Sequence, residues 1–351
     1  MIPVFDGHND TLLRLLHDPA RPFAERAADG HIDAVRAREG GLVGGLFAMF
    51  APGPDVSFRR PGQGAQPNGD DSDSSAKSPP LGPIDAGPAL RATLRMLAVL
   101  RRLERKGALR VCASADEVET AVAEGVLAAV PHLEGAEAIG NELDLEALHA
   151  VGLRSLGPVW SRPNAFATGV PFRFPGSPDV GPGLTEHGRE LVTACDRLRI
   201  VLDVSHLNEA GFWDLLDRSE RPVVASHSNV HALCASPRNL LDTQLEALAE
   251  RDGLVGLNFA VRFLREDGAG DPDTPLELMV RHLGHLLERM GEDRVAFGSD
   301  FDGATMPSTI GDAAGLPRLL DALRQHGWND GLIEKVAYRN WLSLLQRVQV
   351  G

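Results

Sequence analysis

Short apolar runs alternate along the chain with longer segments in which apolar residues recur every three or four positions. The short runs predict strands and the longer segments predict helices. Eight strands are expected, at Pro3–Phe5, Leu42–Phe50, Leu127–Leu133, Leu153–Trp160, Ile200–Val204, Pro222–Ala225, Leu254–Phe259 and Arg294–Gly298. Strands that alternate with helices in this way are typical of a parallel sheet covered by helices.

The helical pattern is clear after the second strand, where Leu90, Leu94, Leu97 and Leu100 are spaced to share one helix face. Eight strand–helix units in 351 residues predict a single α/β domain, a closed (β/α)₈ barrel of the TIM type. An open doubly wound sheet is the alternative architecture. No glycine-rich dinucleotide loop follows the first strand in the sequence, which counts against that alternative.

Residues 51–88 interrupt the alternation after the second strand. They are rich in Pro, Gly, Ser and Asp, with Gly69-Asp70-Asp71-Ser72-Asp73-Ser74-Ser75 at the centre. Such a composition buries too little apolar surface to order itself. We expect a flexible inserted loop. A lid is the sharper alternative, because loops that follow barrel strands lie on the catalytic face.

The composition narrows the class of protein. A hydrophobic content of 43% allows a sizeable core, and no apolar run approaches the length of a membrane span. The formal net charge of −14 argues against a nucleic-acid partner, and no signal peptide is visible. Three widely spaced cysteines are typical of ordinary thiols in a reducing compartment. We therefore expect a cytoplasmic protein without a membrane partner, and a homodimer remains open.

Residues of the types that commonly bind metals follow five of the predicted strands. His8 and Asp10 come just after the first strand, and residues two apart in extended chain point to the same side. The later strand ends contribute Glu134, His206, His227 and Asp300. Each of these residues alone is more often structural, but in a barrel all of these strand ends converge on one crevice. The set therefore predicts a metal centre.

The number of ligands favours two zinc ions. One ion would lie between His8 and Asp10 and the other between His206 and His227, with Glu134 and a water or hydroxide bridging them. The carboxylate after the last strand is then free to manage protons.

Three neighbouring residues are kept out of this ligand set. His132 is expected to line the pocket or pack behind it, and Asp302 is expected to form a turn. Asp203 lies on the side of its strand opposite to His206, so it is left out of the metal site. The remaining histidines fall mostly in helical or loop patterns and are assigned structural roles.

In these motifs the chain resembles the membrane (renal-type) dipeptidases, peptidase family M19, among the amidohydrolase-like metal-dependent hydrolases. The matching motifs occur in family order across nearly the whole chain: Asp6-Gly7-His8-Asn9-Asp10, Glu134-Gly135, Asp203-Val204-Ser205-His206, Ser226-His227-Ser228, Pro237-Arg238-Asn239 and Gly298-Ser299-Asp300-Phe301-Asp302-Gly303. The resemblance implies a (β/α)₈ barrel with a two-zinc site that cleaves dipeptides, often with tolerance for a D-residue at the C-terminal side.

Carried over by position, the resemblance also implies roles for individual residues. It makes Asp300 the acid that handles the proton and Arg238 the group that binds the substrate carboxylate, with Asn239 beside it as a further substrate-binding residue. The implied metal ligands are His8, Asp10, Glu134, His206 and His227.

One position departs from the family pattern. Trp160, in Leu156-Gly157-Pro158-Val159-Trp160-Ser161, stands where many members carry a substrate-contacting histidine. An indole donates one hydrogen bond and cannot become cationic. We expect Trp160 to contact the substrate, with a different preference for substrate polarity.

The sequence therefore predicts a zinc-dependent dipeptidase in which a bridging hydroxide attacks the peptide carbonyl and Asp300 passes the proton to the leaving amine. Two alternatives stay open. One is a metal-binding barrel without turnover that acts as a binding or regulatory protein, and Trp160 is its best support. The other is a hydrolase of another small amide or lactam.

Overall fold

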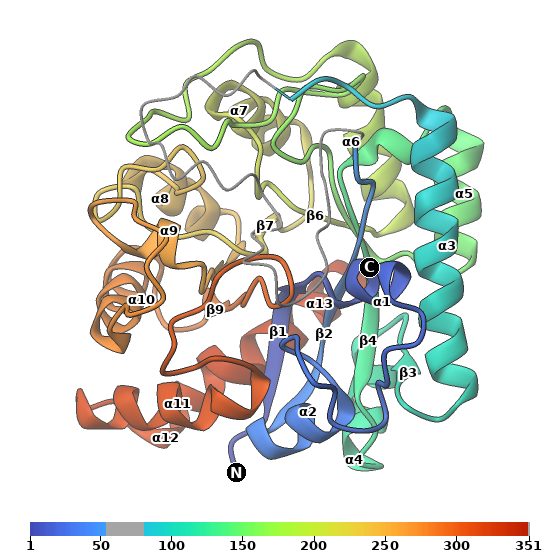
Figure 1. Cartoon of the computed structure of the whole chain (residues 1–351). Helices are drawn as coiled ribbons and strands as arrows, with labels where there is room; N and C mark the ends of the chain where they lie inside the picture. Colours follow the sequence, from blue (N-terminus) through green and yellow to red (C-terminus); the bar gives the residue numbers. More distant parts are fainter. Residues whose placement is uncertain (54–80, 350–351) are drawn as a thin grey trace.

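The computed structural model describes residues 1–53 and 81–349. Its strands are parallel and lie at the centre, with helices around them (Figure 1). The strands are β1 Val4–Asn9, β2 Leu42–Phe50, β3 Arg110–Val111, β4 Ala128–Glu134, β5 Ser155–Gly157, β6 Val201–Leu202, β7 Val224–Ala225, β8 Leu254–Leu257 and β9 Val295–Phe297.

The sheet closes on itself. Hydrogen bonds join the strands in the orders β1-β2-β4-β5-β6 and β7-β8-β9. Parallel bridges span the two remaining gaps, between Asp203 and Val224 and between Asn9 and Phe301. This ring of eight strands confirms the predicted barrel. β3 lies off the ring, paired with the start of β4, and two residues are too short to leave a period in the sequence.

All eight predicted strands exist, but their ends differ from the predictions. β1 continues to Asn9, because the backbone carbonyl of His8 accepts a 3.0 Å hydrogen bond from Asp300 N across the seam of the barrel. β5 stops before Pro158, which has no N–H to continue the ladder. The strand ends that carry the candidate residues are therefore tied to one another through the backbone.

Helices follow the strands and cover the barrel. They are α1 Thr11–His17, α2 Ala34–Gly40, α3 Ala86–Arg105, α4 Ala115–Ala123, α5 Glu142–Ala150, α6 Glu186–Leu198, α7 Glu209–Arg218, α8 Asp242–Glu250, α9 Val261–Leu264, α10 Leu276–Met290, α11 Leu316–Gln325, α12 Asp330–Glu334 and α13 Asn340–Gln349. Side-chain caps define several of their starts, such as Asp33 on α2 and Asn141 on α5.

The predicted inner face of α3 was partly wrong. Leu97 and Leu100 are buried, but Leu94 is 47% exposed. The buried stripe is completed by Ala89, Thr93 and Met96, whose small or mixed side chains do not stand out in a leucine pattern. The predicted insertion at 51–88 lies largely outside the described residues, since 54–80 are not described, and its last three residues open α3.

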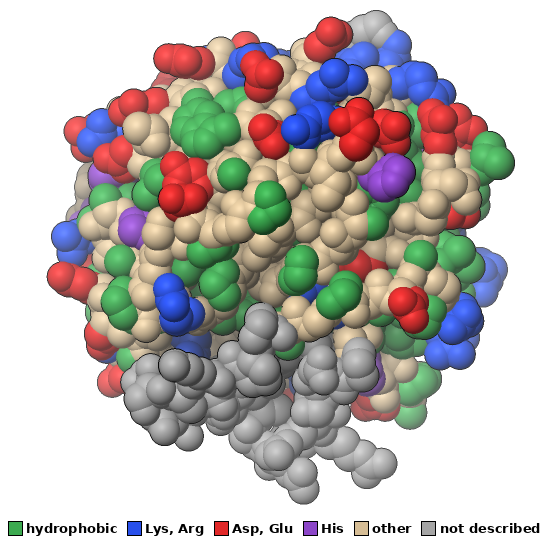
Figure 2. All heavy atoms as spheres, turned by 90° about the horizontal axis from the view of Figure 1, so that it is seen from above, with side chains coloured by type: hydrophobic (Ala, Val, Ile, Leu, Met, Phe, Trp, Pro, Cys, Tyr) green, Lys and Arg blue, Asp and Glu red, His purple; other side chains and the backbone are tan. Residues whose placement is uncertain are grey.

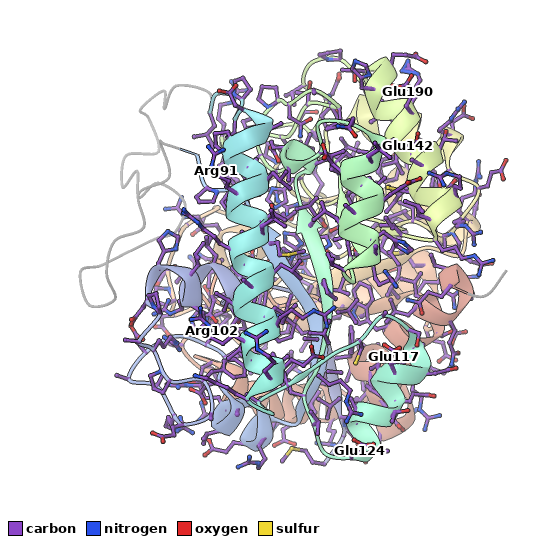
Figure 3. The ribbon with its side chains drawn as sticks, turned by 90° about the vertical axis from the view of Figure 1, so that its right-hand side faces the viewer. Arg91, Arg102, Glu117, Glu124, Glu142 and Glu190 are labelled. Carbon is purple, nitrogen blue, oxygen red and sulfur yellow. The ribbon has the colours of Figure 1, made fainter. Side chains whose placement is uncertain are left out.

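The outer faces of the helices are charged. Arg91 and Arg102 project from α3, and Glu117 and Glu142 from the neighbouring α4 and α5 (Figure 3). Seen from above, acidic and basic side chains are interspersed (Figure 2). In the part of the chain that the structure describes, no helix is both long and apolar enough to cross a membrane.

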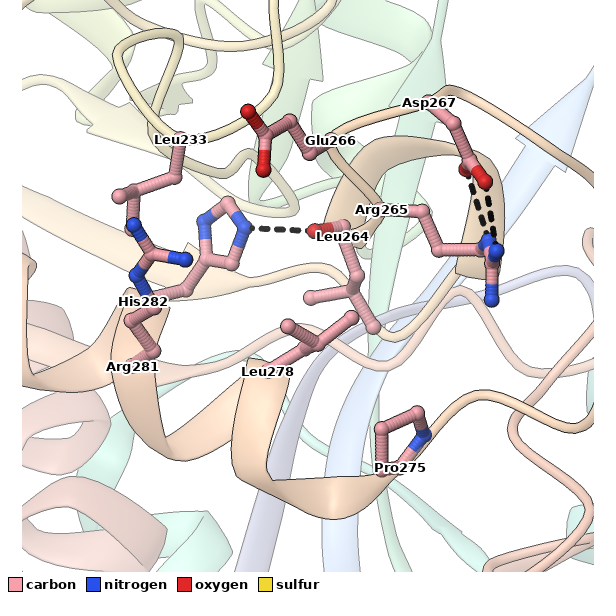
Figure 4. Close-up of a pocket in the computed structure, with 9 residues that line it drawn as sticks. All are labelled: Leu233, Leu264, Arg265, Glu266, Asp267, Pro275, Leu278, Arg281 and His282. Carbon is pink, nitrogen blue, oxygen red and sulfur yellow. Dashed lines mark hydrogen bonds and ion pairs between the residues drawn. The ribbon is translucent and has the colours of Figure 1, made fainter.

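His282 on α10 shows how a buried histidine serves the fold. It is 1% exposed, its Nδ1 accepts a hydrogen bond from Val230 N at 3.2 Å, and its Nε2 donates to Leu264 O at 3.0 Å. The residue borders a hollow of ≈ 500 Å³ between α9 and α10 (Figure 4). Burial lowers the pKa of His282 to about 4. The ring is therefore neutral in the folded protein at physiological pH.

This neutral histidine predicts a loss of stability in acid. The unfolded chain takes up a proton near pH 6.5 and the folded one only near pH 4. The contribution of neutral His282 to the free energy of unfolding is thus complete above pH 6.5 and is lost as the pH falls to 4. This loss amounts to roughly 3 kcal/mol. His282→Gln keeps a donor and an acceptor but cannot titrate, so its free energy of unfolding should fall less steeply over this window. Urea unfolding of both proteins at several pH values measures the difference. His187→Gln, on an exposed side chain, should follow the wild type, and parallel curves for all three proteins would contradict the assignment.

Candidate metal centre

Six side chains meet at the mouth of the barrel, and we call them the strand-end cluster. They come from the ends of five strands and are between 0 and 9% exposed. The cluster consists of His8, Asp10, Glu134, His206, His227 and Asp300. The structure thus brings together every residue that the sequence predicts as a metal ligand, along with the predicted proton carrier.

Backbone strain is concentrated at this mouth. His206 and Asp300 have φ values of 69° and 63°, in the left-handed region that few residues other than glycine adopt. Such conformations cost of order 1–3 kcal/mol and gather at functional sites, where the surrounding structure enforces them. Gly303 has a packing role here, because a Cβ at this position would collide with Asp10 Oδ2 and Asp300 Oδ1. Glycine lets the two carboxylates lie next to each other.

One oxygen of Glu134 faces three imidazoles. Glu134 Oε1 lies 3.7 Å from His8 Nε2, 3.0 Å from His206 Nε2 and 3.6 Å from His227 Nε2. His206 Nε2 and His227 Nε2 are themselves 3.0 Å apart. Glu134 is therefore placed between the histidine from β1 and the two histidines that follow β6 and β7.

His8 provides the test of whether a metal fits. Its Nε2 is fully buried, has no hydrogen-bond partner among the described residues, and lies 3.7 Å from both Asp10 Oδ2 and Glu134 Oε1. These separations are long for hydrogen bonds, but two ligands of one zinc ion with bonds of about 2.0–2.1 Å lie roughly 3.3 Å apart. Two overlapping groups have the geometry to hold an ion: His8 with Glu134 and His227, and His8 with Asp10 and Asp300. The donors present therefore fit a metal.

The charges of the cluster support this conclusion. Burial by itself lowers the pKa of His8, but the carboxylates of Glu134 and Asp10 outweigh burial and raise it to about 10. Positive charge is thus strongly favoured at this position. Burial lowers the pKa of His206 and of His227 well below the usual value, so both remain neutral, as metal ligands must be.

Asp300 is held by a residue that the sequence did not single out. Asn258 follows β8 and donates from Nδ2 to Asp300 Oδ2 at 2.9 Å. Its own Oδ1 accepts a hydrogen bond from Ala260 N at 2.7 Å, which fixes the orientation of the amide. Burial raises the pKa of Asp300, helped by Asp10 and opposed by His8. The strand-end position of Asn258 was the available signal, but an amide is not a typical zinc ligand.

Serines hold the outer nitrogens of two imidazoles. Ser161 Oγ lies 2.7 Å from His206 Nδ1, and Ser226 Oγ lies 2.8 Å from His227 Nδ1. Asp203, which the sequence places outside the metal site, lies behind Ser226. His132 also stays out of the cluster, with its Nδ1 2.9 Å from Ser155 Oγ.

Arg238 is buried next to the cluster without a carboxylate partner. It is 3% exposed and donates to His227 O at 2.9 Å and to Ser228 Oγ at 3.4 Å, while its Nε has no partner in the part of the chain that the structure describes. No carboxylate within the described residues comes within 4.0 Å of its guanidinium. Burial lowers the pKa of Arg238 to about 10, opposed by Asp300 and Glu134, so the side chain is cationic at neutral pH.

Of the other two predicted substrate contacts, Trp160 lies beside the cluster and Asn239 does not. Trp160 is 4% exposed and packs between Phe50, Phe172 and His206, with ring centroids 4.9, 5.3 and 5.8 Å away. Asn239 does not reach the cluster, because its amide donates to Cys234 O and Phe263 O, both at 2.9 Å. Phe263 in turn lies under Arg238, with its ring centroid 5.5 Å from the guanidinium carbon.

A closed (β/α)₈ barrel with a buried His/Glu/His group at its mouth defines the class of metal-dependent barrel hydrolases. Comparison with known proteins narrows the class. The profile of the membrane dipeptidases, peptidase family M19, matches residues 1–350, and the chain belongs to this family. It is accordingly a metallo-dipeptidase, a hydrolase of peptide bonds, as the sequence predicted.

Several relatives are similar over most of their length. An uncharacterized protein encoded in the pqqA 5′ region of Klebsiella pneumoniae is 49% identical over 257 residues, which is 72% of this chain and 95% of that protein. The crystal structure of an M19 metallopeptidase, dipeptidase AC, is 49% identical with a TM-score of 0.91 and covers 99% of this chain and 98% of its own. A metallopeptidase from Rhodobacter sphaeroides, liganded with a phosphinate mimic of the dipeptide L-Ala-D-Ala, is 48% identical with a TM-score of 0.90 over 99% of both chains.

Proposed function

We propose that this metallo-dipeptidase uses two zinc ions to cleave dipeptides with a free C-terminal carboxylate, including those that end in a D-residue. The observation that carries the proposal is Arg238 beside the strand-end cluster, which is buried and cationic and has no carboxylate partner among the described residues. An unpaired buried cation is costly, so its site favours an anion from outside the chain. The C-terminal carboxylate of a small peptide supplies that anion next to the bond to be cleaved.

The strand-end cluster divides into two ligand sets in this proposal. His8 and Asp10 would hold one ion, His206 and His227 the other, and Glu134 would be shared. Bound zinc would supply a Lewis acid for the scissile carbonyl and lower the pKa of a water molecule. The support for this division is the central position of Glu134 Oε1 among the three imidazoles.

Asp300 would move the proton from the attacking water to the leaving nitrogen. Asn258 Nδ2 donates to Oδ2, and this hydrogen bond makes Oδ2 the less basic of the two carboxylate oxygens. Among the described residues Oδ1 accepts no hydrogen bond, and it lies on the side of Gly303 and Asp10. The proton would therefore be carried on Oδ1.

The stereochemical part of the proposal is supported by the Rhodobacter sphaeroides relative, which accommodates a mimic of L-Ala-D-Ala. A phosphinate has tetrahedral phosphorus and resembles the tetrahedral intermediate of amide hydrolysis, so such a ligand indicates a site shaped for the transition state. On the other side of the cluster, Trp160 and the 37% exposed Phe172 form an apolar wall beside His206. This wall favours small apolar side chains over charged ones.

A direct test compares L-Ala-D-Ala, L-Ala-L-Ala and D-Ala-L-Ala, with chelator and with chelator followed by zinc. We expect turnover of the first two peptides, loss with chelator, and recovery with zinc. Turnover that survives complete metal removal would contradict the metal part of the proposal. Cleavage of a lactam in preference to every dipeptide would favour the alternative hydrolase.

Removing the carboxylate grip should weaken catalysis in a specific way. Arg238→Lys keeps the charge but loses the planar guanidinium. We expect kcat/KM for free dipeptides to fall by an amount equivalent to about 1.5–3 kcal/mol of transition-state stabilisation, which is the contribution of a charged hydrogen bond. C-terminally amidated dipeptides should already be poor substrates of the wild type. Steady-state kinetics on each peptide and its amide measure both effects.

Arg265→Lys is the matched control. This arginine lies on the neighbouring loop and pairs with the exposed Asp267, an arrangement that contributes little. Its kinetics should match the wild type. If amidation of the substrate changes neither kcat nor KM, Arg238 is not the anchor.

A further inference from the structure

Asp203, Ser226 and His227 form a continuous hydrogen-bonded chain beneath the strand-end cluster. Ser226 Oγ lies 2.5 Å from Asp203 Oδ2 and 2.8 Å from His227 Nδ1. The three residues are 1%, 0% and 1% exposed. Within the described residues no lysine or arginine pairs with Asp203, and the imidazole of His132, whose Nε2 lies 3.6 Å from Oδ2, is kept neutral because burial lowers its pKa to about 4.

The direction of these hydrogen bonds follows from counting hydrogens. Two backbone N–H groups, from Ser205 and Ser226, donate to Asp203 Oδ1 at 2.9 Å each and fix the orientation of the carboxylate. Its Oδ2 can only accept, so the single hydroxyl hydrogen of Ser226 points at Asp203. The oxygen of Ser226 is then left as an acceptor for His227, whose Nδ1 must carry the hydrogen.

A neutral imidazole with its hydrogen on Nδ1 has a bare lone pair on Nε2, the form that binds a metal. His227 Nε2 is the atom that lies 3.6 Å from Glu134 Oε1. We propose that Asp203 is a positioning residue, which acts through Ser226 to hold His227 in the tautomer that presents Nε2 to a metal. The metal arm of this inference rests on the proposed two-zinc site.

The corresponding contact of His206 differs. Ser161 Oγ lies 2.7 Å from His206 Nδ1, but in the described part of the chain this hydroxyl makes no second hydrogen bond that would fix its hydrogen. Ser161 can either donate or accept, so it does not determine the tautomer of His206. The tautomer of His227 is thus fixed by its hydrogen bonds, whereas that of His206 is not.

Asp203→Asn should reverse the direction of the hydrogen bonds that link residue 203, Ser226 and His227. The two backbone N–H groups still require an acceptor, so the oxygen of the new amide would take the place of Oδ1 and its NH₂ would face Ser226. Ser226 would then accept from this amide and donate to His227 Nδ1, which forces the hydrogen onto Nε2. Ser226→Ala removes the relay without reversing it, and it should have the same effect in the presence or absence of Asp203→Asn.

The first experiment is nitrogen NMR on metal-free protein labelled at histidine, with His227 assigned by comparison with His227→Gln. We expect the Nδ1–H tautomer in the wild type and the Nε2–H tautomer in Asp203→Asn. This measurement needs no metal. An Nε2–H tautomer in the wild type, or no change of tautomer in Asp203→Asn, would overturn the proposal.

The second experiment measures zinc affinity by competition with a chelator. Asp203→Asn should weaken the binding of one of the two zinc ions about 10–100-fold, which is the usual effect of removing the hydrogen-bond partner of a metal ligand. Ser226→Ala should lose less zinc affinity than Asp203→Asn. The variant that carries both substitutions should have the zinc affinity of Ser226→Ala alone. If Asp203 and Ser226 only stabilise the fold, the losses of zinc affinity in the two single variants should add up in the double variant. Thermal unfolding of the metal-free variants measures any loss of fold stability. A wild type that binds fewer than two zinc ions would refute the two-zinc site, while the NMR result would still decide the relay.

Discussion

Asp300→Asn is expected to lower kcat by about 10²–10⁴-fold, the usual contribution of general acid–base catalysis, while bound metal and folding stay near wild type. The substitution keeps the shape of the side chain. Its amide oxygen can still accept the hydrogen bond from Asn258 Nδ2, which lies 2.9 Å from Asp300 Oδ2 in the wild type. Only the ability to carry a proton on the other oxygen is lost. Single-turnover kinetics and elemental analysis on the same preparation measure both quantities.

Asp302→Asn is the matched control, because Asp302 lies two residues further on and shares the left-handed backbone, with φ 66°. Its carboxylate points away from the cluster and accepts hydrogen bonds from Thr11 Oγ1 and His31 N, both at 2.8 Å. This variant should keep most of its turnover. Metal loss in Asp300→Asn in proportion to lost activity would make Asp300 a ligand, as its proximity to His8 and Asp10 allows. Nearly full activity would remove it from the mechanism.

The candidate site was predictable to the extent that it depends on barrel topology. His8 and Asp300 are distant in sequence, but the first and last strands of a closed barrel are neighbours, and the backbone bond from Asp300 N to His8 O joins them. Taking the metal-type residue after each strand was therefore enough to assemble the strand-end cluster. The barrel itself was predictable for a related reason, since the spacing of the apolar runs carries the strand count.

The parts that escaped prediction depend on side-chain direction rather than on residue type. Asn258, Ser161 and Ser226 have the ordinary composition of turns, and nothing in their spacing shows that they hold Asp300, His206 and His227. Arg238 could be named from its motif, but only the tertiary structure shows that it is buried with no carboxylate partner in residues 1–53 and 81–349. Asn239 was named from the same motif, although its amide is used inside the loop. Phe172 came from no motif, and only packing places it beside Trp160.

The same limit explains why Asp203 was set aside. The alternation of side chains along a strand correctly turns it away from His206 and excludes direct ligation. Alternation along one strand does not reveal that the opposite side of that strand faces Ser226 from the next strand of the barrel. A residue excluded from the ligand set on grounds of direction can therefore still control a ligand through one intervening hydroxyl.

Glu134→Gln is expected to have the largest effect on metal content. Glu134 Oε1 lies within 3.7 Å of His8 Nε2, His206 Nε2 and His227 Nε2, so Glu134 is the carboxylate that both proposed ions would share. An amide is a weak neutral donor, and the variant would leave two dications without the negative charge between them. We expect binding of both ions to weaken, with about one zinc or less retained per chain and activity lost in parallel. The His206→Ala, His227→Ala double variant should instead lose only one of the two ions.

Glu137→Gln is the control for burial of a glutamate in the same segment. Glu137 lies three residues further on and is 5% exposed, as Glu134 is, and burial raises its pKa in the same way. It forms no ion pair with the three imidazoles and should keep the wild-type zinc content. Elemental analysis after dialysis at fixed free zinc, with thermal unfolding of the metal-free proteins, separates loss of ligation from loss of fold. If Glu134→Gln retains two ions at wild-type affinity, Glu134 does not bridge them. If the double variant also retains both ions, the division of the strand-end cluster into two ligand sets is wrong, and His8, Asp10 and Asp300 would then have to hold the metal by themselves.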